Sequence, residues 1–426
     1  MLMSAVVSCM CGIGMAAHSL RDPQTAHAVV SLLDELPFFV GLQSSDVNVR
    51  VKTLAALSKR AYLSSQMIER VAGRIMDSDQ VVCVEAELLL RKVGERAVPP
   101  LVRAISGSQE KERIAGLIVL QGLGERSRPA LLEIAKVATD KSSSVRARAM
   151  AALGATGDHR AVVHLIQGLR DKDEVVKRES ACGLGHLGPV AKEAIPEVSR
   201  VAKHYLSQGD DEYRVGESAM GALHGIGVAS VPTLEAIARD STNNSDLRGA
   251  ALEVIGQMAP DSAAALPCLV KILQDRDKQL SDLARDMLRR FGPAAKVALP
   301  VLAEGLKDRS DYARVKSAAT LYAINPQDTR VIKVLVDCLS SGDADARRHA
   351  CDELGMIGKP VADAIPSVEK CLKDPRAEVR RMAALSLLRF GPLAARSEAA
   401  LSECLTDPDE NVRESAGHAL RSIRRK

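Results

Sequence analysis

Apolar residues along this chain follow the period of an α-helix, in stripes that return again and again. The clearest stripe lies within residues 374–391. Its apolar or small positions are spaced by 4, 4 and 3 residues, at Val379, Ala383, Leu387 and Phe390. Such offsets place side chains on one face of a helix. A shorter apolar stripe, such as that at residues 299–306, precedes the longer kind, so the pattern predicts a pair of helices.

The helix pair recurs along nearly the whole chain. If the residue aligned with Arg380 is taken as a register mark, the spacing is 33 residues without exception from Arg248 to Arg413. The twelve marks are Arg50, Cys83, Arg113, Arg146, Lys177, Gly216, Arg248, Ser281, Arg314, Arg347, Arg380 and Arg413. Two short helices cannot bury their apolar faces alone, so the units must stack on their neighbours. The sequence therefore predicts an all-α protein, an α-solenoid (α-α superhelix) of about twelve helix pairs over residues 36–426.

The residues between the stripes are typical of helix ends. Aspartate stands six residues before the mark in eight units, where it can accept hydrogen bonds from the backbone at a helix start. Proline opens the first helix at Pro267, Pro300 and Pro366, positions where it costs no hydrogen bond. Glycines are expected to close the second helices, at Gly154, Gly157, Gly188, Gly227, Gly292, Gly358 and Gly391.

Residues 1–35 precede the first complete unit. The segment from Met10 to Gly14 aligns with Leu223 to Gly227, which ends a repeat helix, so we expect a partial or capping repeat. A targeting segment is the alternative, because the first 20 residues are apolar, although they lack the basic region of a secretory signal. The first reading predicts a cytoplasmic protein and the second an exported one. After this segment no apolar run reaches the ~18 residues of a membrane span.

Composition refines this picture. Only 2% of the 426 residues are aromatic and none is Trp, while 46% are hydrophobic, which suits many thin helical layers. The 58 basic and 54 acidic residues give a net charge of +4, too balanced to indicate nucleic acid by charge alone. Nine cysteines without a CxxC pair indicate neither a disulfide framework nor a zinc ribbon, and they fit a reducing compartment.

Three cysteines recur at intervals of 33, at Cys338, Cys371 and Cys404. A metal ladder is one interpretation of this spacing. The equivalent slot in other units holds small residues, namely Gly168, Gly305 and Ala104. Free cysteine behaves as a small apolar residue, so we expect these three side chains to serve packing.

The repeat resembles a known family in Asp374, Arg380, Ala383 and Gly391, preceded by Ala-Ile-Pro at residues 364–366. It is similar to the HEAT repeat, in the short form known as the phycocyanobilin-lyase-type HEAT-like repeat. The resemblance implies an α-solenoid and, most often, a protein-binding scaffold, with a few enzymes and DNA-binding members. It also implies a ladder of ion pairs between adjacent units, formed by the basic mark and the turn aspartate.

Motifs that could carry chemistry are weak. Residues 183–188 fit the GxGxxG spelling of a dinucleotide-binding loop, but they lie inside a predicted second helix and lack the required preceding strand. HEAT-like diiron hydroxylases use His-Glu dipeptides and HEAT-like DNA glycosylases use Trp, and this chain has neither. We therefore expect no enzyme, no cofactor and no metal site, with a bilin-lyase-like enzyme or accessory protein as the alternative.

Basic residues gather in the C-terminal half. Arg348 and Arg381 occupy one slot of successive units, and Arg290 and Arg389 share another. Arg421 continues the charge toward the C-terminal residues Arg424, Arg425 and Lys426. This row could follow an acidic protein or a phosphate backbone. Because acidic residues are interleaved with it, a solvated face is the simpler interpretation, and nucleic-acid binding is a second alternative.

The 39-residue spacing between Lys177 and Gly216 contains an insertion. We expect it to enlarge the turn between the helices around residues 204–214, which carry Tyr205 and Tyr213. Insertions in repeat arrays map to loops, and tyrosine is frequent in interface hot spots. The sequence as a whole predicts a monomeric, non-catalytic scaffold that binds another protein along its concave, second-helix face.

Overall fold

The structure, a computed structural model, describes residues 35–208, 214–275 and 277–424. Within these ranges the regular elements are α-helices and short 3-10 helices, without any strand. Each register mark lies in one of twelve second helices, as the sequence predicts. The second helices are α3 (Val47–Leu57), α5 (Gln80–Val93), α7 (Glu110–Leu123), α9 (Ser143–Ala155), α11 (Glu174–Leu187), α13 (Val215–Ile226), α15 (Ser245–Gln257), α17 (Lys278–Phe291), α19 (Asp311–Ile324), α21 (Ala344–Ile357), α23 (Ala377–Phe390) and α25 (Glu410–Ile423).

A first helix precedes each second helix. That of the first unit covers residues 35–42. The others are α4 (Ser65–Ala72), α6 (Val98–Ile105), α8 (Leu131–Val137), α10 (Ala161–Gly168), α12 (Ile195–Gln208), α14 (Val231–Arg239), α16 (Leu266–Ile272), α18 (Leu299–Gly305), α20 (Arg330–Cys338), α22 (Ile365–Lys370) and α24 (Glu398–Glu403). Proline lies in the first turn of α16, α18 and α22, as predicted. The predicted all-α solenoid is therefore confirmed.

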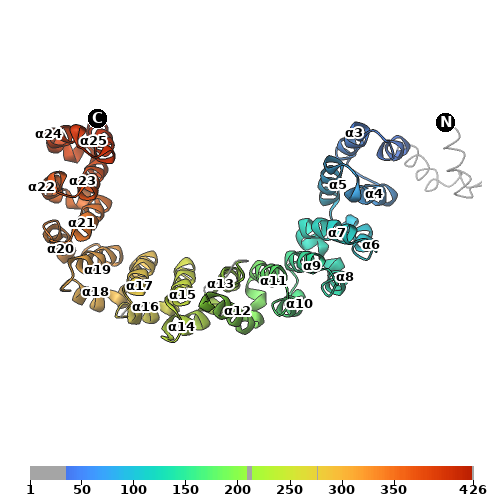
Figure 1. Cartoon of the computed structure of the whole chain (residues 1–426), viewed down its shortest axis with the longest axis horizontal. Helices are drawn as coiled ribbons and strands as arrows, with labels where there is room; N and C mark the ends of the chain where they lie inside the picture. The colour runs from blue at the N-terminus through green and yellow to red at the C-terminus, as the bar shows by residue number, and fades with distance from the viewer. Residues whose placement is uncertain (1–34, 209–213, 276, 425–426) are drawn as a thin grey trace, which may run out of the picture. The chain divides into compact units, whose positions relative to one another are not determined.

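The helices pack through buried Leu, Val, Ile and Ala side chains. They divide into two compact units, residues 1–201 with 211–225, and residues 202–210 with 226–426. Within each unit, successive second helices contact one another in chain order, for example α21, α23 and α25 in the second unit (Figure 1). Among the described residues, no helix is both long enough and apolar enough to cross a membrane.

Most of the predicted helix-closing glycines do end second helices. Eight glycines after second helices have positive φ, a conformation that L side chains rarely adopt, at Gly94, Gly124, Gly157, Gly188, Gly227, Gly292, Gly358 and Gly391. The prediction for Gly154 is wrong, because this residue lies inside α9. A Cβ atom on Gly154 would lie 2.4 Å from the Cα atom of Gly183 in α11. Gly154 therefore permits a close approach of two helices.

The GxGxxG segment at residues 183–188 has the same structural role. It lies in α11, ahead of the capping Gly188, without the strand and loop that phosphate binding requires. A Cβ atom on Gly185 would lie 3.2 Å from the Cα atom of Ala222 in α13, and one on Gly225 would lie 2.4 Å from the Gly185 carbonyl oxygen. These glycines let α9, α11 and α13 pack with their backbones nearly in contact.

The insertion differs from its predicted form. Residues 204–208, expected in a loop, continue α12 to Gln208, because this stretch contains no Gly or Pro that would end a helix. Tyr213 lies outside the described residues, as do the terminal Arg425 and Lys426 and the predicted capping repeat or targeting segment at residues 1–34.

Candidate partner-binding surfaces

The basic marks form a ladder along the turns between first and second helices. In six units the arginine of one unit forms an ion pair with the turn aspartate of the next. The pairs are Arg50–Asp77, Arg113–Asp140, Arg146–Asp171, Arg248–Asp275, Arg347–Asp374 and Arg380–Asp407. We call each pair a rung. The predicted ladder of staples between adjacent units is thus present.

Five of the six rung arginines also donate hydrogen bonds to carbonyl oxygens of their own turn, and Arg248 donates to that of Ala238 in α14. Arg347 donates two hydrogen bonds to the Asp374 carboxylate, at 2.6 and 2.9 Å, and one to the Ser341 carbonyl oxygen at 2.8 Å. Asp374 in turn accepts a hydrogen bond from the Arg376 backbone N–H. Burial alone would raise the pKa of Asp374, but the bonds from Arg347 and Arg376 outweigh it and hold this pKa below its ordinary value.

The turn aspartate is not itself the helix cap. In the last unit Asp407 accepts from the backbone N–H of Asp409, and Asp409 then accepts from the first N–H groups of α25. The cap therefore lies two residues after the predicted one. Asp407 therefore binds the rung arginine and the turn, whereas Asp409 caps the start of α25.

The ladder is interrupted in the second unit. Ser281 replaces the rung arginine, and the equivalent partner aspartate, Asp308, is exposed. The next mark, Arg314, pairs with Asp311 inside its own helix, because the turn position that would receive it is Ser341. Two consecutive rungs are therefore missing between α17 and α21.

A different contact spans this gap on the second-helix side. Arg289 at the end of α17 forms a two-point ion pair with Glu353 on α21, at 2.7 and 3.1 Å. The helix between them, α19, packs against both. Its residues Val315, Ala319 and Thr320 are buried. Neighbouring side chains therefore cover this face of α19.

A pocket of about 480 Å³ lies at the missing rung, between α16 and α18. Asp308 and Arg285 both line it. Arg285 donates hydrogen bonds to Ser281 and Asp282 on its own helix, and its Nε has no partner. The pocket therefore lies beside the position of the missing rung.

The predicted basic row is distributed over several second helices of the second unit. Arg348 lies on α21 and Arg381 on α23, helices that pack side by side. Arg389 forms an ion pair with Asp352 at 2.6 Å, and Arg348 lies 3.6 Å from Asp345. Exposed Arg290 and Arg421 end α17 and α25. Acidic neighbours thus neutralise part of the row, and its role as a partner site stays a prediction.

The predicted tyrosine site is only partly described. Tyr205 is half-buried in α12, and its ring meets the His204 ring edge-on at 5.0 Å between centroids. Since Tyr213 is outside the described residues, whether the two tyrosines come together stays a prediction.

An apolar surface lies on the first unit, at positions that were not predicted as a site. Two slots, one and five residues after the mark, lie on one face of each second helix, and in α5 this face points away from the core. In α3, α5 and α7 both slots are apolar, with Val51, Ala55, Val84, Leu88, Ile114 and Ile118. Val84 and Leu88 are 42% and 53% exposed, and Val81 beside them is 55% exposed. We call this set the apolar rows.

The signal for the apolar rows was present in the sequence. Helix α5 is apolar on two faces, since Val82, Ala86 and Leu89 are buried while Val81, Val84 and Leu88 face outward. A helix with a single core-facing stripe would carry polar residues at the outward positions. In α17 and α21 the same slots are in fact charged or polar, with Asp282, Asp286, Arg348 and Asp352.

The described part of the chain contains no group of three or more His, Cys, Asp or Glu side chains placed to hold a metal ion. Cys338, Cys371 and Cys404 are buried. Their thiols contact backbone carbonyl oxygens of the preceding unit or turn, in agreement with the predicted packing role.

Comparison with known proteins gives a repeat family for two segments of the chain and a fold for most of it. Residues 98–185 and 332–421 match the family model described as HEAT repeats. No curated protein matches the chain. Solved structures that resemble it include the karyopherin Kap121p bound to the SUMO protease Ulp1p (TM-score 0.60, 13% identity) and Kap121p bound to Nup53p (TM-score 0.61, 13% identity). In both cases 92% of this chain and 49% of the other chain are covered, so this chain spans about half the length of those structures.

Proposed function

We propose that this chain, whose residues 98–185 and 332–421 match HEAT repeats, is a non-catalytic scaffold that binds a partner protein on its second-helix face. The observation that carries this proposal is the apolar rows on α3, α5 and α7. They place apolar side chains in both outward slots of three successive second helices, on a surface that the fold itself leaves exposed at Val84 and Leu88.

Clustered exposed apolar residues on a soluble protein mark interaction sites, whereas scattered ones need no explanation. The rows are bordered by charged groups, including the ion pair of Arg91 with Glu87 and the Lys92 ammonium on the Ser58 carbonyl oxygen. An apolar centre with a polar rim is the usual anatomy of a protein interface. We therefore propose that the occupant is an amphipathic segment of the partner, with its apolar side against α5.

Solved structures of the same fold support this use. Kap121p, to which the chain is similar in fold, has been solved in complexes with Ulp1p and Nup53p. Contacts from many repeats are what such an array offers a long segment. We further propose that the basic row, with Arg348 and Arg381, extends the contact to acidic groups of the partner, in a monomeric and cytoplasmic protein.

The bilin-lyase-like and nucleic-acid alternatives stay predictions. No arrangement among the described residues favours the first. For the second, Asp352 already pairs with Arg389, and Asp345 lies near Arg348, which weakens the attraction that phosphates would experience.

Photo-cross-linking from the full chain tests the proposed surface. A photoreactive residue at position 88 is expected to capture one or a few partner proteins from extract, each of which is then purified and its affinity for the chain measured. The double variant Val84→Glu/Leu88→Glu should weaken that affinity at least about tenfold, because it places charge in an apolar interface.

Leu132 and Val163 provide the matched control. They are as exposed as Leu88, at 63% and 54%, but lie on the first helices α8 and α10 of the same unit. Leu132→Glu/Val163→Glu should leave the affinity unchanged, and a photoreactive residue at position 132 should not capture the same partners. Equal capture from positions 88 and 132, or equal affinity of the two double variants, would refute the proposal.

A further inference from the structure

Cys338, Cys371 and Cys404 occupy one slot of three successive units, yet their surroundings differ. The residue 20 positions earlier lies on the preceding second helix. Before Cys371 it is Cys351 on α21, whereas before Cys338 and Cys404 it is Ala318 and Ala384. Cys371 thus has a second thiol where the other two have a methyl group.

The two thiols interact directly. Cys351 is fully buried, and its side chain interacts with that of Cys371, which raises the pKa of Cys351 and lowers that of Cys371. For Cys338 and Cys404, burial instead raises the pKa. The thiolate is the reactive form of cysteine, so this contact favours reaction at Cys371.

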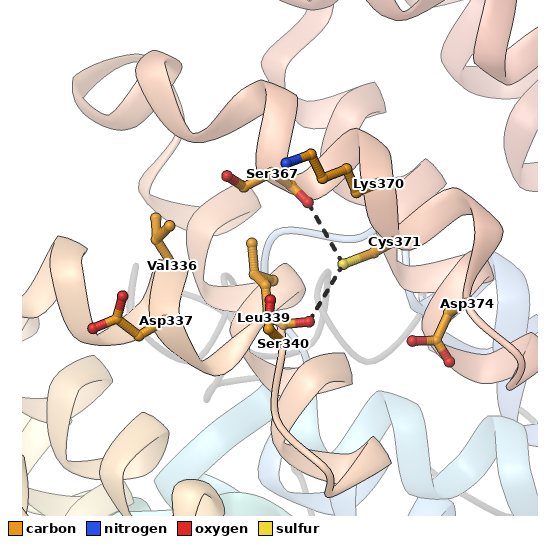
Figure 2. A pocket seen from close by; sticks show the side chains of 8 residues that line it. All are labelled: Val336, Asp337, Leu339, Ser340, Ser367, Lys370, Cys371 and Asp374. Carbon is orange, nitrogen blue, oxygen red and sulfur yellow. Dashed lines mark hydrogen bonds between the residues drawn. The ribbon is translucent and has the colours of Figure 1, made fainter.

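Cys371 also borders an open space. It lines a pocket of about 410 Å³ between α20 and α22, together with Ser340, Ser367 and Lys370. Figure 2 shows the Cys371 sulfur between the carbonyl oxygens of Ser367 and Leu339, which lie 3.7 and 3.9 Å away. A small polar oxidant can therefore reach the sulfur from the pocket side, while Cys351 is buried in the core.

We propose that Cys371 and Cys351 form a peroxide-sensitive thiol pair that closes to a disulfide. The Cys371 thiolate attacks one oxygen of hydrogen peroxide, an S–O bond forms, the O–O bond breaks, and the released hydroxide takes up a proton as water. The Cys351 sulfur then attacks the Cys371 sulfenic acid and passes its proton to the departing hydroxyl. The S–S bond forms, a second water leaves, and the two thiols have lost two electrons to the peroxide.

The disulfide would cross the seam between two successive units. Cys351 belongs to the second helix α21, and Cys371 begins the 3-10 turn η10 (Cys371–Lys373) of the next unit. The two sulfur atoms must approach to about 2.0 Å for the bond to form. Because one side of Cys371 faces the pocket, its side chain has room to move toward Cys351. The bond would lie beside the Arg347–Asp374 rung and fix the same seam covalently.

The proposal can be tested on the unmodified full chain, with Cys338 and Cys404 as internal controls. The reduced protein is treated with hydrogen peroxide, remaining thiols are blocked with N-ethylmaleimide under denaturing conditions, and tryptic peptides are analysed by mass spectrometry. Trypsin cleaves after Lys370 and so separates the two cysteines. We expect a Cys351–Cys371 disulfide that dithiothreitol reverses, and a loss of the Cys371 thiol at least about tenfold faster than that of Cys338 or Cys404.

Two alanine variants test the two steps separately. Alanine already stands at the equivalent slots of other units of this chain. In Cys351→Ala, dimedone should trap a sulfenic acid at Cys371 and no disulfide should form. In Cys371→Ala, Cys351 should stay reduced. A Cys371 that reacts no faster than Cys404 would overturn the proposal. So would a wild-type protein in which Cys371 is oxidised without forming a bond to Cys351.

Discussion

At the scale of single residues, the rung arginine has a role that its immediate neighbour lacks. Arg347 is bound to Asp374 and to its own turn, and its side chain is 12% exposed. Arg348 is 30% exposed, lies 3.6 Å from Asp345 and contacts the neighbouring His349 ring. Removing one partner of a buried ion pair leaves the other charge without compensation, whereas exposed pairs contribute little.

We therefore expect Arg347→Ala to lower the free energy of unfolding of the surrounding units by about 3 kcal/mol. Arg348→Ala should lower it by less than about 1 kcal/mol. Urea denaturation followed by circular dichroism measures both. Equal losses would show that the ladder does not stabilise the stack.

The rungs also predict a dependence on pH. The hydrogen bond and charge of Arg380 hold the pKa of Asp407 below its ordinary value. A lowered pKa in the folded state contributes stability above the ordinary aspartate pKa of about 3.9, and this contribution is lost as the pH falls through the folded-state pKa. The difference in denaturation midpoint between wild type and Asp407→Asn should hold steady from pH 7 to about 5 and shrink below about 4. A difference that is undiminished at pH 3 would contradict this account.

The repeat predicted the rungs but not every role. Asp374 and Arg380 recur at fixed slots, and the resemblance to the HEAT repeat implied that they pair between units. Gly154 was assigned to a helix end, because glycine serves both at helix ends and at close contacts between helices. Only the three-dimensional position of Gly183 distinguishes the two roles.

At the scale of helices, we expect the same substitution at two glycines to change stability in opposite directions. A Cβ atom on Gly154 in α9 would lie 2.4 Å from backbone of α11, whereas one on Gly221 in α13 would meet nothing within 4 Å. Gly154→Ala should destabilise the first unit by about 1–3 kcal/mol, since α9 and α11 must move apart. Gly221→Ala should stabilise it by about 0.5–1 kcal/mol through helix propensity. Thermal unfolding of both variants is the measurement, and a destabilised Gly221→Ala protein would contradict the assigned packing.

The interrupted ladder predicts a gain from repair. Ser281→Arg would place a guanidinium in the pocket at the missing rung, opposite exposed Asp308. We expect a gain of at most about 1 kcal/mol, because Asp308 is exposed and Arg285 adds a like charge. The double variant Ser281→Arg/Asp308→Asn should lose the gain. A gain of equal size in the double variant would show that the new side chain acts by packing and not as a rung.

The sequence predicted the second helices better than it predicted the insertion and the exposed surfaces. Each second helix was predicted from its stripe, because the core imposes the same spacing in every unit. The extension of α12 to Gln208 was missed, since an insertion breaks the period that served as the guide. The apolar rows were not predicted, because the core-facing stripe sets the period while the outward slots of α5 differ from those of other units.

At the scale of the whole molecule, the period predicts contacts between neighbouring units and nothing beyond them. The pair of Arg289 with Glu353 joins residues 64 apart, two units along the chain. Its formation depends on how closely the second helices approach over α19, and no repeat position encodes that distance. The covering of Val315 and Thr320 likewise follows from the assembled helices.

Since packing runs from neighbour to neighbour, stability should be local. Arg380→Ala removes the last rung, between the units of α23 and α25. Amide hydrogen exchange should then accelerate in those two helices, while α7, α9 and α11, which belong to the other compact unit, keep the rates of the wild type. Mass spectrometry of exchanged peptides measures each helix separately, with Arg381→Ala as the control on the same helix. Equal acceleration in both compact units would mean that the array unfolds as one cooperative body, and the rungs would then stabilise the whole chain rather than single seams.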